Sequence, residues 1–283
     1  VGAQLSASEQ VQGIMFTGST EVAKILQKTV AKRLSKNGES IPLIAETGGQ
    51  NAMIVDSSAL TEQVVLDVVS SAYDSAGQRC SALRVLCVQE DNADAVIQML
   101  KGAMQQLQVG NPYLLKTDIG PVIDAEAQEN IQKHIDKMRQ KGHRVHQLMR
   151  NDAQDTEINA GTFITPTLIE LPNLNDLERE VFGPVLHVIR FNQGSLKQLL
   201  EHINSKGYGL TMGLHTRIDE TIQTVMTHAE VGNLYINRNI VGAVVGVQPF
   251  GGEGLSGTGP KAGGPIYLYR LMQNCSAKKL NKP

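Results

Sequence analysis

A cysteine with small and polar neighbours stands in the segment Gly77-Gln78-Arg79-Cys80-Ser81, between a predicted helix and a predicted strand. Scaffolds present reactive side chains at such junctions, and polar surroundings favour the thiolate, which is the nucleophilic form of cysteine. The alternative is a small buried hydrophobe, the commoner role of a free cysteine and the one expected for Cys87 and Cys275. The sequence therefore predicts Cys80 as a nucleophile and the other two cysteines as bystanders.

Two glutamates are candidates to work beside that thiol. Glu46 follows an apolar segment and precedes Gly48-Gly49, so its carboxyl group is expected at the carboxyl end of a strand, where open α/β sheets bind ligands. A carboxylate in that place can act as a general base, and the alternative is a solvated loop acid. Glu180, which is followed by Phe182 and the turn residues Gly183-Pro184, is the next candidate acid.

Two glycine-containing motifs suggest nucleotide phosphates, but only one has the expected context. In Thr17-Gly18-Ser19-Thr20 a strand runs into a helix, and backbone N–H groups of a first helical turn can face a phosphate. An ordinary capped surface helix is the alternative. Residues 252–257 match G-x-G-x-x-G, yet that fingerprint requires a strand before it and a helix after it. Pro249 and Pro260 flank this motif, so it is interpreted as a decoy.

Strands and helices must position these residues, and the apolar pattern indicates both. Short β-branched segments predict strands, and longer amphipathic segments between them predict helices. The alternation favours an α/β fold with doubly wound parallel sheets. The predicted strands are residues 12–16, 42–45, 52–55, 83–88, 185–191, 210–215 and 233–237, and the predicted helices are residues 20–33, 60–75, 92–106, 125–141, 195–203 and 218–229.

Composition limits the class of protein. At roughly 100–200 residues per domain, 283 residues allow one large or two modest domains, and 41% hydrophobic residues predict a sizeable core. A formal net charge of −2 disfavours binding to nucleic acid or to an anionic membrane surface. No apolar run reaches the roughly 20 residues that span a bilayer. Three cysteines argue against a disulfide framework and for a reducing compartment. His143 and His146 lack an accompanying ligand set, so no metal site is expected.

Five motifs occur in the order found in the NAD(P)-dependent aldehyde dehydrogenase superfamily, which the chain resembles over nearly its whole length. Glu201-His202-Ile203-Asn204 and His215-Thr216-Arg217-Ile218-Asp219-Glu220 resemble the 1-pyrroline-5-carboxylate dehydrogenase branch. Ile236-Asn237-Arg238-Asn239 resembles the dehydrogenase module of bifunctional bacterial proteins that also carry a flavin-dependent proline dehydrogenase. The five motifs are Thr17-Gly18-Ser19-Thr20-Glu21-Val22, Glu46-Thr47-Gly48-Gly49, Gly77-Gln78-Arg79-Cys80, Glu180-Val181-Phe182-Gly183-Pro184 and Pro249-Phe250-Gly251-Gly252.

The resemblance implies a covalent mechanism. The Cys80 thiolate attacks the aldehyde carbon, the hemithioacetal passes a hydride to NAD, and the resulting thioester is hydrolysed by a water that Glu46 activates. A cysteine of unperturbed pKa is only a few per cent thiolate at neutral pH, so the site must lower that pKa or remove the proton.

The resemblance also implies binding residues for the cofactor NAD. Gly18 and Ser19 match the region that binds the dinucleotide phosphates. Glu180 matches the acid that hydrogen-bonds the nicotinamide ribose, and Phe182 matches the aromatic residue that helps to place the ring.

For the substrate, the branch implies glutamate γ-semialdehyde. Ser81, Gly242 and Ala243 match the anchor for its α-carboxylate, and Phe250 matches the residue that packs on its aliphatic stem. Backbone N–H groups in a glycine-rich turn bind anions without a charged side chain, which agrees with an anchor of this composition.

The implied organisation is a remnant of an NAD-binding domain at residues 1–45, a catalytic domain at 46–237 and a substrate-anchoring and return loop at 238–264. Residues 265–283 are expected to form a C-terminal oligomerisation strand, near 266–272, and a tail. Gln50 departs from the lysine common in the superfamily. The chain opens on Val1 without a methionine or a signal region, so position 1 is expected to be a cut. The superfamily's oxyanion-stabilising asparagine and adenosine-ribose lysine precede Gly13 and have no match, so we expect this chain alone to be poorly active.

The expected activity of the intact enzyme is the NAD-dependent oxidation of glutamate γ-semialdehyde to glutamate in proline catabolism. We expect a cytoplasmic bacterial homo-oligomer with a proline dehydrogenase domain in the same parent chain, which alone would hold FAD. Peripheral attachment of that parent to the inner membrane is a further option. Two alternatives remain open: an aldehyde dehydrogenase of other substrate specificity, and a non-catalytic assembly fragment.

Overall fold

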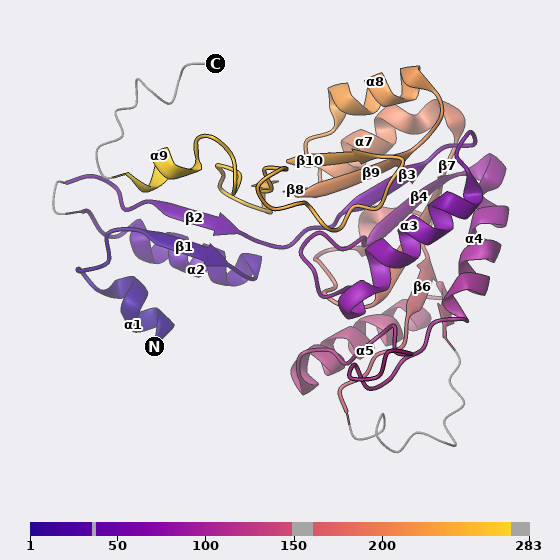
Figure 1. Cartoon of the computed structure of the whole chain (residues 1–283), viewed down its shortest axis with the longest axis horizontal. Helices are drawn as coiled ribbons and strands as arrows, with labels where there is room; N and C mark the ends of the chain where they lie inside the picture. The colour runs from indigo at the N-terminus through magenta and orange to yellow at the C-terminus, as the bar shows by residue number, and fades with distance from the viewer. Residues whose placement is uncertain (36–37, 149–160, 273–283) are drawn as a thin grey trace.

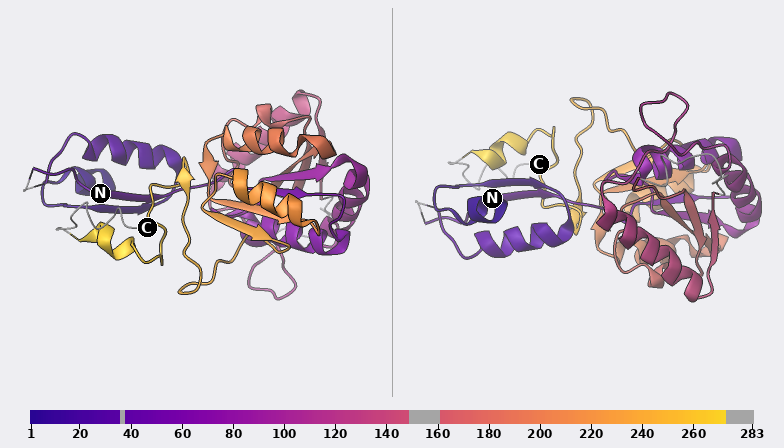
Figure 2. Two further views of the ribbon diagram at one scale, coloured as in Figure 1. Left: turned by 90° about the horizontal axis from the view of Figure 1, so that it is seen from above. Right: turned by 90° about the horizontal axis from the view of Figure 1, so that it is seen from below.

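The computed structural model describes residues 1–35, 38–148 and 161–272, which form a small lobe and a large lobe (Figure 1). In the small lobe, β1 (Ile14–Thr17) and β2 (Leu43–Glu46) form a two-stranded parallel sheet. Apolar side chains of α2 (Thr20–Val30) pack on this pair, and α1 (Gly2–Ala7) contacts α2. The last helix, α9 (Tyr267–Leu271), lies on the side of the sheet opposite α2 (Figure 2). The small lobe thus combines segments from both ends of the chain.

The large lobe is built around a seven-stranded sheet in the order β10-β9-β3-β4-β7-β6-β5. Every pair of neighbours is parallel except β5 and β6. The central strands β3 and β4 are buried at every residue, which explains why their sequences are apolar almost without interruption. The bounds are β3 (Ala52–Val55), β4 (Val85–Gln89), β5 (Arg144–Gln147), β6 (Thr167–Glu170), β7 (Val185–Phe191), β9 (Thr211–His215) and β10 (Asn233–Ile236).

Helices cover both faces of this sheet. From β3 the chain passes to β4, crosses to the edge strand β5, steps back through β6 to β7, and then continues to β9 and β10 on the other side of β3. With right-handed crossovers, this reversal places α3 and α4 on one face and α7 and α8 on the other (Figure 1). A sheet of this kind opens its ligand crevice at the carboxyl ends of the strands. The bounds are α3 (Thr61–Tyr73), η1 (Asp74–Gly77), α4 (Glu90–Met104), α5 (Ala125–Gln140), η2 (Leu174–Asp176), η3 (Gln193–Ser195), α7 (Leu196–Asn204) and α8 (Asp219–His228), with a small antiparallel pair of β8 (Tyr208–Gly209) and β11 (Glu253–Gly254).

The predicted fold class is confirmed, and each strand and helix predicted within residues 12–237 occurs within a few residues of its expected bounds. The strands β3 and β7 match their predictions to the residue. The sheet is not wholly parallel, because β5 pairs antiparallel with β6 at one edge. These two strands are missing from the prediction, since β5 carries mostly polar side chains and neither gives a clear period.

The strand expected near residues 266–272 is wrong, because α9 occupies that segment. Alternation of apolar and polar residues over so few positions does not separate a strand from a helix. A helical turn closes its hydrogen bonds locally, as the Tyr267 N–H does with the Gly264 carbonyl at 3.2 Å. A strand needs a neighbouring strand for the same bonds. The rest of the predicted tail, including Cys275, lies outside the described residues.

Within the described ranges, no helix combines the length and the apolar character needed to cross a membrane. The same part of the chain contains no group of three or more His, Cys, Asp or Glu side chains placed to hold a metal ion. His143 instead contacts the Asp176 carboxylate, with 2.8 Å between Nε2 and Oδ2.

Candidate active site

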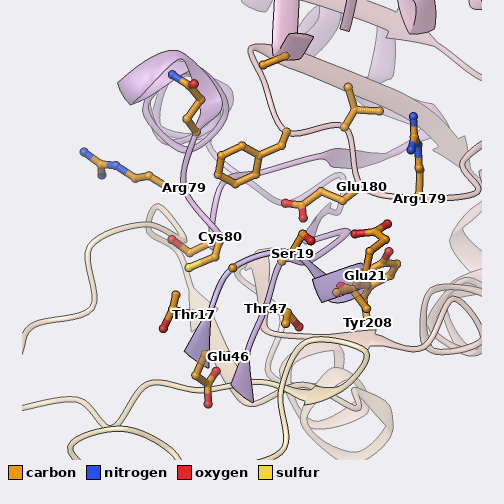
Figure 3. Close-up of a pocket in the computed structure, with 18 of the residues that line it drawn as sticks. Thr17, Ser19, Glu21, Glu46, Thr47, Arg79, Cys80, Arg179, Glu180 and Tyr208 are labelled. Carbon is orange, nitrogen blue, oxygen red and sulfur yellow. The ribbon is translucent and has the colours of Figure 1, made fainter. Parts of the chain in front are cut away.

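A cleft of about 1330 Å³ lies where the two lobes meet, beside the carboxyl end of β2 and the turn that follows α3 (Figure 3). Residues from distant parts of the sequence line its walls. They include all ten residues that the sequence predicts for a site: Gly18, Ser19, Glu46, Cys80, Ser81, Glu180, Phe182, Gly242, Ala243 and Phe250. The structure therefore brings the predicted residues together, while their chemical roles stay predictions.

An unusual turn presents Cys80 to the cleft. Ser75, Ala76 and Gly77 follow one another with positive φ angles of 56°, 54° and 65°, and a left-handed backbone costs roughly 1–2 kcal/mol at a non-glycine residue. Gly77 has a second constraint, because a Cβ there would lie 2.2 Å from the Gly183 carbonyl oxygen. Only glycine allows this approach, so the turn packs directly against the loop that carries Glu180. Cys80 itself is half-buried.

The thiol is held mainly in its protonated form. Burial raises the pKa of Cys80, and the carboxylates of Glu180 and Glu46 raise it further. These two acids act against the thiolate that the polar neighbours of Cys80 were predicted to favour. A nucleophilic cysteine whose pKa is not lowered needs a group that removes its proton. Cys87 is fully buried on β4, as predicted, and burial alone raises its pKa.

Asn51 fixes the chain on either side of the nucleophile, and the sequence prediction missed it. Its Nδ2 donates to the carbonyl oxygens of Cys80 at 2.7 Å and Ala82 at 2.8 Å, and its Oδ1 accepts from the Thr211 N–H at 3.2 Å. A Cβ at Gly49 would lie 2.3 Å from that Oδ1, so the second glycine after Glu46 makes room for the amide. The available signal was an amide side chain directly before an entirely apolar strand, where a buried polar group must have partners.

Replacing Asn51 by alanine is expected to lower the free energy of unfolding by about 1–3 kcal/mol, because two carbonyl groups lose their donor in a buried place. Urea unfolding of the variant beside the unaltered protein measures this difference. Asn92→Ala is the control, since Asn92 donates one hydrogen bond, of 3.2 Å, to the Asp56 carbonyl. Equal losses from the two variants would contradict the assignment.

Glu46 ends β2, but its carboxylate points away from the thiol. Figure 3 shows it directed toward the C-terminal glycine segment, where Oε2 accepts a 3.1 Å hydrogen bond from the Gly252 N–H. A Cβ at Gly251 would lie 2.9 Å from Oε1, and one at Gly257 would lie 3.1 Å from Oε2. Burial raises the pKa of Glu46 to about 7, against the lowering effect of the Gly252 hydrogen bond. Gly252 and Gly257 of the decoy motif, with Gly251 directly before it, thus surround a carboxylate.

The first turn of α2 also lines the cleft, beside the end of β2. Ser19 is its N-cap, with the side chain accepting a 3.2 Å hydrogen bond from the Val22 N–H. The Gly18 N–H donates to the Glu46 carbonyl at 3.2 Å, which ties the helix start to the end of β2. The helix thus presents its capped N-terminus to the cleft, where negative groups are favoured.

Glu180 reaches into the cleft from the loop before β7. Its Oε1 pairs with the buried guanidinium of Arg84 at 3.0 Å, and a backbone hydrogen bond from Gly49 also favours the carboxylate. Burial nevertheless dominates and raises the pKa of Glu180. Phe182 is 44% exposed at the rim, and the Arg84 Cζ lies 5.2 Å from its ring centroid. Arg84 is a second functional candidate that the sequence prediction missed.

The loop that carries Gly242 and Ala243 starts at Asn237, whose conformation is fixed by hydrogen bonds to Thr216. Asn237 has a φ of 52°, and its side-chain amide bonds both backbone groups of Thr216, at 3.0 Å to the N–H and 2.9 Å to the carbonyl. Asparagine tolerates this left-handed conformation better than most residues. Gly242, at a φ of 78°, then turns the chain into the cleft beside Ser81, which is buried.

Comparison with known proteins agrees with this geometry. A family model described as the aldehyde dehydrogenase family matches residues 1–276. The chain belongs to the aldehyde dehydrogenase family. Bifunctional protein PutA of Klebsiella aerogenes is 66% identical over 275 residues, which are 97% of this chain and 21% of that protein.

Solved structures place this aldehyde dehydrogenase chain among the same relatives. Proline utilization A of Bradyrhizobium japonicum superposes with a TM-score of 0.88 at 51% identity, covering 95% of this chain and 27% of that one. A 1-pyrroline-5-carboxylate dehydrogenase from Thermus with bound NAD superposes with a TM-score of 0.84 at 35% identity, covering 95% of this chain and 51% of that one. The chain therefore spans about a fifth to a half of the length of these relatives.

Proposed function

We propose that the protein carrying this chain oxidises L-glutamate γ-semialdehyde to L-glutamate with NAD, as the second oxidation of proline catabolism. The observation that carries the proposal is the single cleft in which Cys80, Glu46 and the Gly242-Ala243 loop meet. A thiol, a base and an anion-binding turn are the groups that this reaction needs. The relatives named PutA and 1-pyrroline-5-carboxylate dehydrogenase support the choice of substrate.

The cleft fits a dinucleotide cofactor. It runs from Cys80 to the N-terminus of α2 at Ser19, which suits the pyrophosphate. A Cβ at Gly48 would lie 1.6 Å from the Glu180 Oε2, so a bare backbone leaves this carboxylate room to meet ribose hydroxyls, with Phe182 beside the ring. When bound, NAD supplies the hydride acceptor. Gly18 and Ser19 hold its phosphates in this proposal.

The chemistry of the chain begins with the Cys80 thiol. Its sulfur adds to the aldehyde carbon while the thiol proton passes to the carbonyl oxygen, which gives a hemithioacetal. Loss of a hydride from that carbon, for which bound NAD would be the acceptor, and of the hydroxyl proton to solvent would turn the hemithioacetal into a thioester. Glu46, with a pKa raised to about 7, then takes a proton from the water that attacks the thioester carbon. To do so it must rotate away from its hydrogen bond with Gly252. Hydrolysis releases the carboxylate product and restores the thiol.

Substrate selection is assigned to the part of the cleft lined by Ser81, Gly242 and Ala243. Ser81 and the backbone N–H groups of Gly242 and Ala243 take up the α-carboxylate, because the positive φ of Gly242 allows the nest conformation that binds anions. Phe250 packs on the aliphatic stem. These roles fit a five-carbon aldehyde with a carboxylate at its far end.

We also propose the setting of the parent protein. Its relatives named PutA suggest a proline dehydrogenase domain in the same chain, where FAD would bind. Free thiols at Cys80 and Cys87 agree with a reducing, cytoplasmic location. A homo-oligomer remains proposed, although the strand expected to form it is helix α9. The relatives' names give no support to peripheral attachment at the inner membrane.

Turnover of glutamate γ-semialdehyde against pentanal tests the substrate. For the natural gene product that carries this sequence, we expect kcat/KM to favour the semialdehyde by roughly 10²-fold or more, since a site built for a polar group discriminates strongly against an analogue that lacks it. Equal kcat/KM values would favour an aldehyde dehydrogenase of other specificity. The chain of 283 residues alone is proposed to be poorly active, and a rate equal to that of the natural product would contradict this.

Thiol labelling separates catalysis from a pure assembly role. Iodoacetamide is expected to modify Cys80, which lines the cleft, much faster than Cys87, which is fully buried. Faster labelling shows access rather than catalysis, so the decisive comparison is protection by glutamate γ-semialdehyde. A Cys80 no more reactive than Cys87, or one that the substrate leaves unprotected, would favour the assembly fragment.

A further inference from the structure

Arg84 is the largest fully buried side chain in the described part of the chain, and it lies beside the cleft without lining it. Its side chain is 2% exposed. Burying a guanidinium is unfavourable unless its N–H groups are paired. The partners of Arg84 therefore indicate what this position is for.

All five N–H groups of the guanidinium are paired. Nε and Nη2 donate to the Glu180 Oε1 at 3.3 and 3.0 Å. Nη1 donates to the carbonyl oxygens of Gly77 at 2.7 Å and Gly183 at 3.1 Å. The second Nη2 hydrogen reaches the Arg79 carbonyl at 3.1 Å. Two of these partners belong to the turn that presents Cys80, and the others belong to the loop of residues 180–183.

The two loops meet at Arg84. A Cβ at Gly77 would lie 2.2 Å from the Gly183 carbonyl oxygen, so their backbones touch where Nη1 bonds both. The Arg84 backbone is itself anchored, because its N–H donates to the Asn51 carbonyl at 3.0 Å and its carbonyl accepts from the His187 N–H at 2.9 Å. A fixed strand end thus holds a planar donor group between two loops.

The His187 side chain reinforces this anchor. Its Nδ1 lies 3.0 Å from the Arg84 carbonyl oxygen, which only accepts, so Nδ1 carries the hydrogen. Nε2 is then an acceptor for His134, whose Nε2 lies 2.8 Å away and which lines the cleft. Burial lowers the pKa of His187 to about 3, so the ring stays neutral beside the cation.

We propose that Arg84 is a positioning residue that holds the nucleophile turn and the Glu180 loop as one unit. The inference rests on the proposed function, in which Cys80 carries the substrate and Glu180 holds the nicotinamide ribose. Arg84 sets how these two groups stand relative to each other. Lysine cannot replace it, because an ammonium lacks the planar fork that bonds an acid and three carbonyl groups together.

The first test is a double-mutant cycle of Arg84→Lys and Glu180→Gln in the natural gene product. Each single variant is expected to raise the KM and the dissociation constant of NAD about 10-fold or more, since misplacement by about 1 Å has large effects. The double variant is expected to be no more than about twofold worse than the poorer single variant, because both changes break one unit. Arg190→Lys is the matched control, as Arg190 is a partly exposed arginine paired with Glu90 and Asp94.

The dissociation constant, measured by calorimetry, does not depend on turnover. If the wild-type protein binds NAD but does not oxidise glutamate γ-semialdehyde, the proposed function fails and the cycle on NAD binding still stands. Effects of Arg84→Lys and Glu180→Gln that multiply in the double variant would overturn the positioning role. So would a folded Arg84→Lys protein whose NAD affinity lies within about twofold of wild type.

A second variant covers the case in which Arg84→Lys does not fold. Glu180→Asp keeps the charge near Cys80 but shortens the reach to Arg84. If Arg84 links the loops, the rate of Cys80 alkylation by iodoacetamide at fixed pH changes about threefold or more. An unchanged rate, followed by mass spectrometry of the Cys80 peptide, would overturn the proposal.

Discussion

Cys80→Ala is expected to reduce NAD-linked oxidation of glutamate γ-semialdehyde by roughly 10⁴-fold or more in the natural gene product, the scale seen when a covalent nucleophile is removed. The reason is the loss of the sulfur that forms the hemithioacetal and the thioester. Among the described residues, the lining of the cleft includes no second cysteine, so no other described thiol can take over this role. Initial rates at saturating NAD and semialdehyde measure the loss.

Cys87→Ala is the matched control, since Cys87 is a fully buried thiol on the neighbouring strand β4 and does not line the cleft. It is expected to lower the unfolding temperature through a small core cavity and to keep its kcat. Residual activity of Cys80→Ala above a hundredth of wild type would exclude covalent catalysis through this residue. Loss of activity in Cys87→Ala with normal folding would equally contradict the assignment.

The sequence correctly predicted the helices and strands whose apolar pattern can be read from consecutive residues. The strands β3 and β7 are apolar along their length, and the amphipathic helix α5 begins at an aspartate cap, Asp124, whose carboxylate accepts from the Ala127 N–H at 2.8 Å. The period and the cap are both visible in consecutive residues. The short edge strand β5 and helix α9 were not predictable in the same way, because packing and pairing partners decide such segments.

The same limit explains which site residues were found. Cys80, Glu46 and Glu180 stand in ordered motifs, so their types and positions can be recognised from neighbouring residues alone. Asn51 and Arg84 act through carbonyl groups that no sequence pattern reveals. Their partners lie up to 160 and 99 residues away along the chain.

The effect of nearby acids on the pKa of Cys80 could not be predicted from the sequence either. Polar neighbours of Cys80 suggested a favoured thiolate, whereas the fold places the Glu46 and Glu180 carboxylates near the sulfur and shields all three from water. Only the tertiary arrangement shows that the cleft gathers negative charge around its nucleophile.

Glu46→Gln is expected to lower kcat by roughly 10²–10⁴-fold, the usual contribution of a general base, while the first chemical step continues. The thioester on Cys80 should then accumulate, because glutamine cannot accept a proton from water. Intact-mass spectrometry after mixing with NAD and semialdehyde detects the adduct. A base works when deprotonated, so with a pKa of about 7 the wild-type hydrolysis rate rises between pH 6 and 8, and this rise disappears in Glu46→Gln.

Glu170→Gln is the control, because Glu170 is a partly buried acid paired with Lys101 at 2.9 Å and does not line the cleft. It should keep both the rate and its rise with pH. If Glu46 were only a solvated loop acid, Glu46→Gln would retain the wild-type rate and profile, and no adduct would build up. If Glu46→Gln lost the first step as well, with no adduct and no reduced cofactor, the carboxylate would have to act before the thioester forms. The raised pKa of Cys80 makes that second outcome informative, since it would identify Glu46 as the group that removes the thiol proton.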